Sequence, residues 1–215
     1  GSVNVGGDGN IFLGGRSGAK NVSGDGNTFV GFASGNNNQG GHYNTYLGAD
    51  AGNMNQVGSD NVMIGVAAGF NNNGDQNTFI GQAAGLSSTG SFLHFVGYTA
   101  GRNKTTGTNN HFTGYRAGRL NTTGSFNYFS GPDAGYNNLG GNLNAFIGYA
   151  AGHTNTAGIE NIYIGPHSGF HSNANRTVFL GYKTGYGNTT GDNNTFVGHQ
   201  SGLNNTIGAD NTFIG

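Results

Sequence analysis

An aromatic residue recurs every 16 or 17 positions along the chain, in 12 of 13 repeats, and Met63 takes its place in the other. A glycine follows two positions later, and we number it position 0. Position −1 is Leu, Val or Ile in 11 of 13 repeats, and position −4 is Asn in 11 of 13. The consensus is N-T-F-I-G-x-x-A-G-x-x-N-T-T-G-x-x. Aromatic and β-branched residues bounded by Asn and Gly predict a short strand at each N-T-F-I-G.

The glycines keep the same period. They fall into three columns, at position 0, at +4 and about ten residues after position 0, and these columns hold 37 of the 45 glycines. A disordered linker has no reason to keep such a register, whereas stacked repeats do. We therefore predict an all-β fold, a parallel β-solenoid (β-roll) of about thirteen 16–17-residue coils with one or two short strands each. We assign residues 7–215 to one solenoid domain and interpret residues 1–6 as a tag remnant or a partial coil.

Alternation along the strand separates two faces. Asn at −4 and the aromatic at −2 share one face, which is nearly constant from repeat to repeat, as the narrow interior of a solenoid requires. In-register stacking of identical side chains is economical in such an interior. The predicted core stack consists of Phe29, Phe79, Phe95, Phe112, Phe129, Phe146, Phe179, Phe196 and Phe213.

The other face carries positions −3 and −1. A strand that is apolar on both faces is normally buried on both, so we expect the aliphatic stripe at −1 to pack against other copies of the chain, most simply in a homotrimeric rod. A wide monomeric β-helix with both stripes inside is the alternative. The predicted oligomer interface consists of Leu47, Ile64, Ile80, Val96, Ile147, Ile164, Leu180 and Val197.

Composition and charge exclude several classes of protein and of partner. Eight Lys and Arg against nine Asp and Glu give a net charge of −1, which argues against nucleic acid as a partner. No apolar run approaches 18 residues, so we expect no membrane insertion by this segment. The chain has no Cys and only 2 Pro, which excludes a disulfide scaffold and collagen.

Candidate chemistry is sparse. His94 and His111 occupy position −3 in consecutive repeats, and together they are a weak candidate metal or anion site. A hydrated gap in an interface is the alternative explanation. Asp25, Asp60 and Asp210 fall in turns, where their side chains can hydrogen-bond nearby backbone. We expect no cofactor and no catalytic residues.

The variable columns leave room for binding. Position +1 and position +5 carry aromatic residues that we expect to be exposed at the corners, where they could stack on sugar rings or touch a partner. Packing on the next coil is the alternative. The candidate ligand-binding residues are Tyr98, Tyr115, Tyr149, Tyr182, Tyr136 and Tyr186.

The repeat sequence also resembles a known family, and this resemblance covers residues 7–215. Asn194–Gly198, followed by two residues and then Ser201 and Gly202, resembles the head repeats of YadA-like trimeric autotransporter adhesins. Those heads are trimeric left-handed parallel β-rolls. The N-T-F-I-G repeats are also similar to bacterial surface proteins and phage-type tail-fibre proteins. This chain departs from the adhesin heads in its longer repeat and in Phe where that family usually carries Ala.

The resemblance implies an extracellular location, on a cell surface or a virion tail. It implies a structural or adhesive fibre segment whose partners are its own copies and a host or environmental surface, of which a glycan is one candidate. Two alternatives stay open. An ice-binding solenoid would need a regular Thr array, but position −3 is Thr in only five of 13 repeats. A polysaccharide-degrading tailspike-like β-helix would need a carboxylate cleft.

Overall fold

The computed structural model describes residues 5–103 and 105–215, which divide into two compact units, Gly1–Thr108 and Asn109–Gly215. Residues 1–4, part of the predicted tag remnant or partial coil, lie outside the described residues. The described residues contain thirteen strands of three residues and no helix. The first unit holds β1 (Ile11–Leu13), β2 (Thr28–Val30), β3 (Thr45–Leu47), β4 (Val62–Ile64), β5 (Thr78–Ile80) and β6 (His94–Val96). The second unit holds β7 (His111–Thr113), β8 (Tyr128–Ser130), β9 (Ala145–Ile147), β10 (Ile162–Ile164), β11 (Val178–Leu180), β12 (Thr195–Val197) and β13 (Thr212–Ile214).

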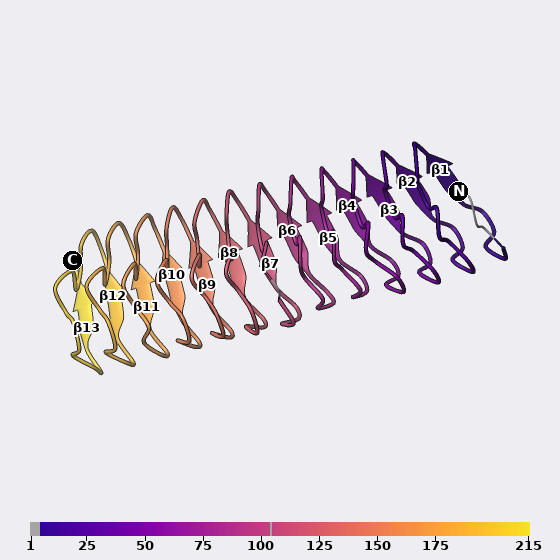
Figure 1. Ribbon diagram of the computed structural model, residues 1–215. Coiled ribbons are helices and arrows are strands. Elements are labelled where there is room, and N and C mark those ends of the chain that lie inside the picture. The colour runs from indigo at the N-terminus through magenta and orange to yellow at the C-terminus, as the bar shows by residue number, and fades with distance from the viewer. Residues whose placement is uncertain (1–4, 104) are drawn as a thin grey trace. The chain divides into compact units, whose positions relative to one another are not determined.

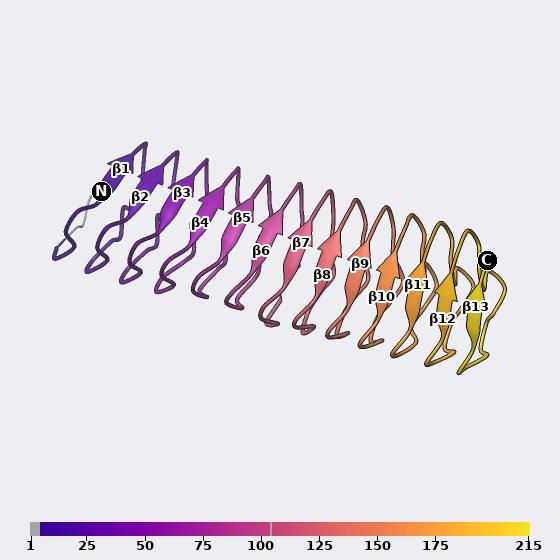
Figure 2. The same cartoon turned by 180° about the vertical axis from the view of Figure 1, so that it is seen from behind.

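Within each unit the strands form a parallel ladder in chain order. Figure 1 shows neighbouring strands side by side and pointing the same way, and Figure 2 shows the same stacking from behind. Each residue pairs with its repeat equivalent, as Phe29 pairs with Tyr46 in the first unit and Phe129 with Phe146 in the second. The fold is therefore the predicted parallel β-solenoid, with one strand per coil among the described residues.

Within the part of the chain that the structure describes, the return segments between strands form no second strand, because their backbone is repeatedly left-handed. Positions +2, +4 and −5 have φ near +55° to +65°, as in Ala33, Gly35 and Tyr43. Left-handed residues cannot continue an extended strand. These segments are instead held by hydrogen bonds to the next coil, such as Gly35 N to Ala51 O at 2.9 Å.

The aromatic column at −2 forms the core of each unit. Neighbouring rings lie nearly parallel, with the centroids of Phe129 and Phe146 4.9 Å apart and those of Phe146 and Tyr163 4.7 Å apart. Eight of the nine predicted core phenylalanines are fully buried, whereas Phe213 stacks on Phe196 and stays 41% exposed. Complete burial of one such ring is worth up to about 3 kcal/mol.

Asparagines at −4 join each coil to the next inside this core. The Asn144 side chain accepts a hydrogen bond from the backbone N–H of Asn161 at 3.0 Å and donates one to the Gly158 carbonyl at 2.8 Å. The same pair of bonds recurs at Asn27, Asn44 and Asn127. Buried backbone N–H and C=O groups must find hydrogen-bond partners. The Asn column supplies these partners at positions that lie outside the strand ladder.

Two of the glycine columns are required by both conformation and space. At position 0, Gly31 has φ +135°, and a Cβ there would overlap the Gly48 carbonyl of the next coil. At +4, Gly35 has φ +55°, and a Cβ would overlap the ring of Phe29. These two glycine columns, which are evident in the sequence, therefore mark where coils approach one another and where the chain turns over the core rings.

The two tyrosines in the core column have dedicated hydrogen-bond partners. Asn55 donates to the Tyr46 hydroxyl at 2.7 Å. The Tyr163 hydroxyl lies 2.8 Å from Ser172 Oγ and 2.9 Å from Thr177 Oγ1, and both of these residues stand where most coils carry Asn. Burial raises the pKa of Tyr163 to about 12 despite these hydrogen bonds, which lower it, so the phenol is neutral at physiological pH.

Candidate functional site

The outer side of the strands is a half-exposed apolar surface. We call positions −3 and −1 of each strand the strand face. Most strands follow an intermediate–buried–intermediate pattern, and Leu47, Ile162 and Ile164 are 47%, 42% and 41% exposed. All eight predicted interface residues lie on this face. The alternation of side chains along the strand, as predicted from the sequence, thus places the aromatic residue at −2 inside and the aliphatic residue at −1 outside.

Charged residues are segregated on the two sides of the strand face. Seven of the nine acidic residues lie at positions −6 and −5, just before the strand, and we call this side the acidic edge: Asp8, Asp25, Asp60, Asp75, Glu160, Asp192 and Asp210. Six of the eight basic residues lie at +2, +5 or +6, beyond the end of the strand, and we call that side the basic edge: Arg16, Lys20, Arg102, Arg116, Arg119 and Lys183.

Some of the acidic side chains at this edge hold neighbouring coils together by hydrogen bonds. Side chains at −6 accept hydrogen bonds from the backbone N–H of the −6 residue in the preceding coil. Asp25 accepts from Asp8 N at 2.8 Å, and Asp75 accepts from Ser59 N at 2.8 Å. These bonds agree with the structural interpretation of Asp25 as a turn residue. A shallow hollow of about 550 Å³ between Asp60 and Asp75 lies on this edge of the first unit.

The predicted ligand-binding tyrosines fall into two different environments. Tyr98, Tyr115, Tyr149 and Tyr182 at +1 are 40–50% exposed. In the second unit Pro132 and Pro166 separate Tyr115, Tyr149 and Tyr182 along the column, so these three tyrosines do not stack on one another. Tyr182 stacks instead on His199, with ring centroids 5.3 Å apart.

Tyr136 and Tyr186, at +5, are not the exposed corners that the sequence predicts. Both are half-buried, because they belong to a stack of rings that we call the aromatic ladder: Tyr136, His153, Phe170 and Tyr186. Successive ring centroids lie 5.2, 4.9 and 5.3 Å apart, with interplanar angles of 5°, 5° and 16°. Packing on the next coil, the alternative left open by the sequence, is what these two residues do.

Cations and imidazoles flank the aromatic ladder. Arg116 makes a bidentate ion pair with Asp133, at 2.7 and 2.8 Å, and Asp133 in turn raises the pKa of Arg116. Lys183 Nζ lies 5.7 Å from the ring centroid of Tyr186. Burial lowers the pKa of His153 and of His167 below the ordinary 6.5, and Asp133 opposes that shift at His153. Both imidazoles are therefore mainly neutral at pH 7.

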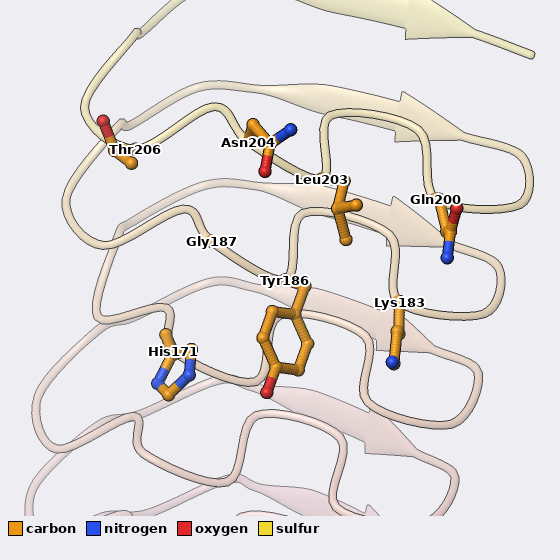
Figure 3. Close-up of a pocket in the computed structure, with 8 residues that line it drawn as sticks. All are labelled: His171, Lys183, Tyr186, Gly187, Gln200, Leu203, Asn204 and Thr206. Carbon is orange, nitrogen blue, oxygen red and sulfur yellow. The ribbon is translucent and has the colours of Figure 1, made fainter.

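A groove of about 440 Å³ opens where the aromatic ladder ends (Figure 3). Tyr186, His171 and Lys183 lie on one side of it, and Leu203 and Asn204 come from the following coil. The volume lies within the range of small-molecule sites. Among the groove residues, only Tyr186 is a ligand-binding candidate predicted from the sequence. The signal that could have found the groove is the break in the +5 column, from aromatic residues to Leu203.

His94 and His111 are placed on the strand face, in β6 of the first unit and β7 of the second. His111 Nε2 lies 3.2 Å from Thr113 Oγ1, and its ring stacks on Tyr128 at 4.8 Å. Over the described residues, no group of three or more His, Cys, Asp or Glu is arranged to hold a metal ion. The same residues contain no helix of a length and apolarity that would cross a membrane.

The chain was compared with family models, with curated proteins and with solved structures, and none of the three comparisons found a match.

Proposed function

We propose that this chain is a structural and adhesive segment of an extracellular fibre, similar to a surface-adhesin head or a tail-fibre shaft. In this proposal several copies, most simply three, associate through the strand face, and the corner residues are presented for attachment to a host or environmental surface. The observation that carries the proposal is the aliphatic strand face, because the core of each coil is already filled by the aromatic column.

The exposed area of the strand face supports association. In β9 to β12 of the second unit, the aliphatic residues Ile147, Ile164, Leu180 and Val197 follow one another at position −1 on adjacent strands. Monomeric soluble proteins rarely expose contiguous apolar patches of more than a few hundred Å². A stripe that continues from strand to strand is therefore best explained as an interface.

The charge distribution supports a second copy of this chain as the partner. When copies pack around an axis parallel to the coil stack with their strand faces inward, the acidic edge of one copy meets the basic edge of the next. Such an arrangement is a closed cyclic oligomer, the common form for homo-oligomers. Complementary edges also fix the relative direction of the copies, because an antiparallel arrangement would bring like charges together.

The oligomer is tested by light scattering at micromolar concentration. We expect a mass that is a multiple of 22.0 kDa. The double substitution Ile147→Asp and Ile164→Asp should reduce it to the monomer, since two carboxylates would be buried in an apolar interface. The matched control Tyr149→Ala changes an exposed corner residue and should leave the mass unchanged. A monomeric parent chain would overturn the proposed assembly.

A further inference from the structure

The repeat pattern breaks at one place beside the aromatic ladder. Position +5 is aromatic from Tyr136 to Tyr186, but the next coil has Leu203. At position +6 of the coil that carries Tyr186 stands Gly187, whereas the coils before and after it carry His171 and Asn204. The smaller side chains leave the groove of about 440 Å³ seen in Figure 3. In a repeat array, a local departure of this kind can create a single site among otherwise equivalent coils.

The groove combines an aromatic ring with several hydrogen-bonding groups. Phe170 stacks on the Tyr186 ring at 5.3 Å, and the His171 ring meets it edge-on at 5.0 Å and 82°, so the ring is held in place. Gln200 and Asn204, both exposed, bring amide groups that can donate and accept. An amphipathic aromatic ring beside amides suits a sugar residue, which has apolar C–H faces and a rim of hydroxyls.

The charge of the groove is cationic. Lys183 lies on its wall and makes no ion pair within the part of the chain that the structure describes. None of the residues that line the groove is acidic. On the same edge of this unit, Asp133 is neutralised by Arg116. An anionic group bound beside Lys183 would therefore meet an unmatched positive charge.

We propose that this groove binds one residue of an acidic polysaccharide. The C–H face of the sugar would pack on the Tyr186 ring, its carboxylate would pair with Lys183, and its hydroxyls would hydrogen-bond Gln200 and Asn204. The inference rests on the proposed attachment function, for which it names the chemical class of the surface ligand.

The test uses the full chain and isothermal titration with an oligogalacturonate and with its methyl ester, which keeps the sugar rings but removes the charge. We expect the acid to bind roughly tenfold more tightly than the ester, as the loss of one charge-assisted contact implies. Lys183→Met should abolish that difference, because it keeps most of the apolar stem without the charge. Tyr186→Ala should weaken both ligands roughly tenfold or more. The control Tyr43→Ala changes an exposed ring of the first unit, outside the groove, and should change neither affinity.

A second variant fills the groove without removing its polar groups. Leu203→Phe continues the aromatic ladder by one ring, and we expect it to block binding while the urea midpoint stays at or above that of the parent. Equal affinity for acid and ester would overturn the acidic class, and absence of binding to both would overturn the site. Either result leaves the light-scattering test of the fibre proposal separate, since the titration reads ligand binding and not assembly.

Discussion

At the scale of single residues, the coil depends on backbone conformations that side chains usually avoid. Twenty-three non-glycine residues among those described have positive φ, at positions +2 and −5 of successive coils. Each left-handed non-glycine residue costs about 1–2 kcal/mol. Gly9 and Gly26 stand at −5 in the first coils, so the same turn is built there without that cost. The solenoid thus carries local strain that the stacked core and the hydrogen bonds between coils offset.

Phe92 offers a direct measurement of this strain. It lies at −5 with φ +59° and is 56% exposed, so its ring contributes little packing. We expect Phe92→Gly to be more stable than Phe92→Ala by about 1 kcal/mol, because only glycine adopts positive φ freely. Urea unfolding of the two variants measures the difference. The opposite order, which is usual at ordinary surface positions, would show that the turn is not left-handed in solution.

At the scale of the coil and its strand, the Asn column replaces the hydrogen bonds that a longer ladder would supply. A three-residue strand pairs few backbone groups, and the residues before it lie inside the core. Asn144 is 1% exposed and supplies both a donor and an acceptor to the next coil. The column therefore joins coils in the same way that Phe stacking does, but through polar groups.

Replacing Asn144 by Ala should destabilise the chain by roughly 2–5 kcal/mol, because one buried N–H and one buried C=O each lose a partner. The measurement is the urea midpoint. Asn204→Ala, at an exposed Asn of the same unit, is the matched control and should change stability by less than about 0.5 kcal/mol. Similar losses for the two variants would contradict the proposed role of the column.

The aromatic ladder makes stability depend on pH. The pKa of His153 and that of His167 are lowered in the folded chain, mainly by burial, so the unfolded chain binds protons more readily. Their contribution is present above the unfolded pKa of 6.5 and is lost as pH falls below it. Among the charged and titratable groups around His153, Asp133 opposes this loss of stability, whereas Arg116, His167 and His171 add to it.

We therefore expect a lower melting temperature at pH 5.5 than at pH 7.5, a window that lies above the ordinary carboxyl range. His153→Phe keeps a ring in the ladder and removes one titrating group, so it should reduce the difference. His199→Asn, at an exposed histidine outside the ladder, should keep it. An unchanged difference in His153→Phe would show that His153 does not carry the effect.

At the scale of the whole molecule, the proposed assembly depends on how the two charged edges of neighbouring copies would meet. The edges occur in both units, and in each unit the strand face lies between them. In the proposed assembly, long-range attraction between edges would guide association and select the parallel orientation, whereas the aliphatic strand face would supply most of the affinity. The two contributions can be separated by salt and by charge reversal.

We expect assembly to weaken when Glu160 and Asp210 are changed to Lys, and when Arg102 and Arg119, basic-edge residues outside the groove, are changed to Glu, because each variant places like charges on facing edges. Combining all four substitutions should restore assembly, since the edges are complementary again. Analytical ultracentrifugation at about 0.1 M and about 1 M salt measures the effect, which screening should reduce at the higher salt. Failure of the combined variant to recover would contradict edge pairing.

The sequence by itself determined the coil length, the buried column, the outward aliphatic column and the places where glycine is needed. It could do so because each coil packs against equivalent neighbours, so the same spatial constraint selects the same residue type at the same position of successive repeats. The tertiary structure decided the features that occur at one place in the array and do not repeat. Tyr136 and Tyr186 lie in a ladder instead of at open corners, because His153 and Phe170 fill the coils between them. The groove exists because Gly187 and Leu203 leave space that side chains from adjacent coils fill elsewhere, and such packing depends on contacts between residues far apart in the sequence.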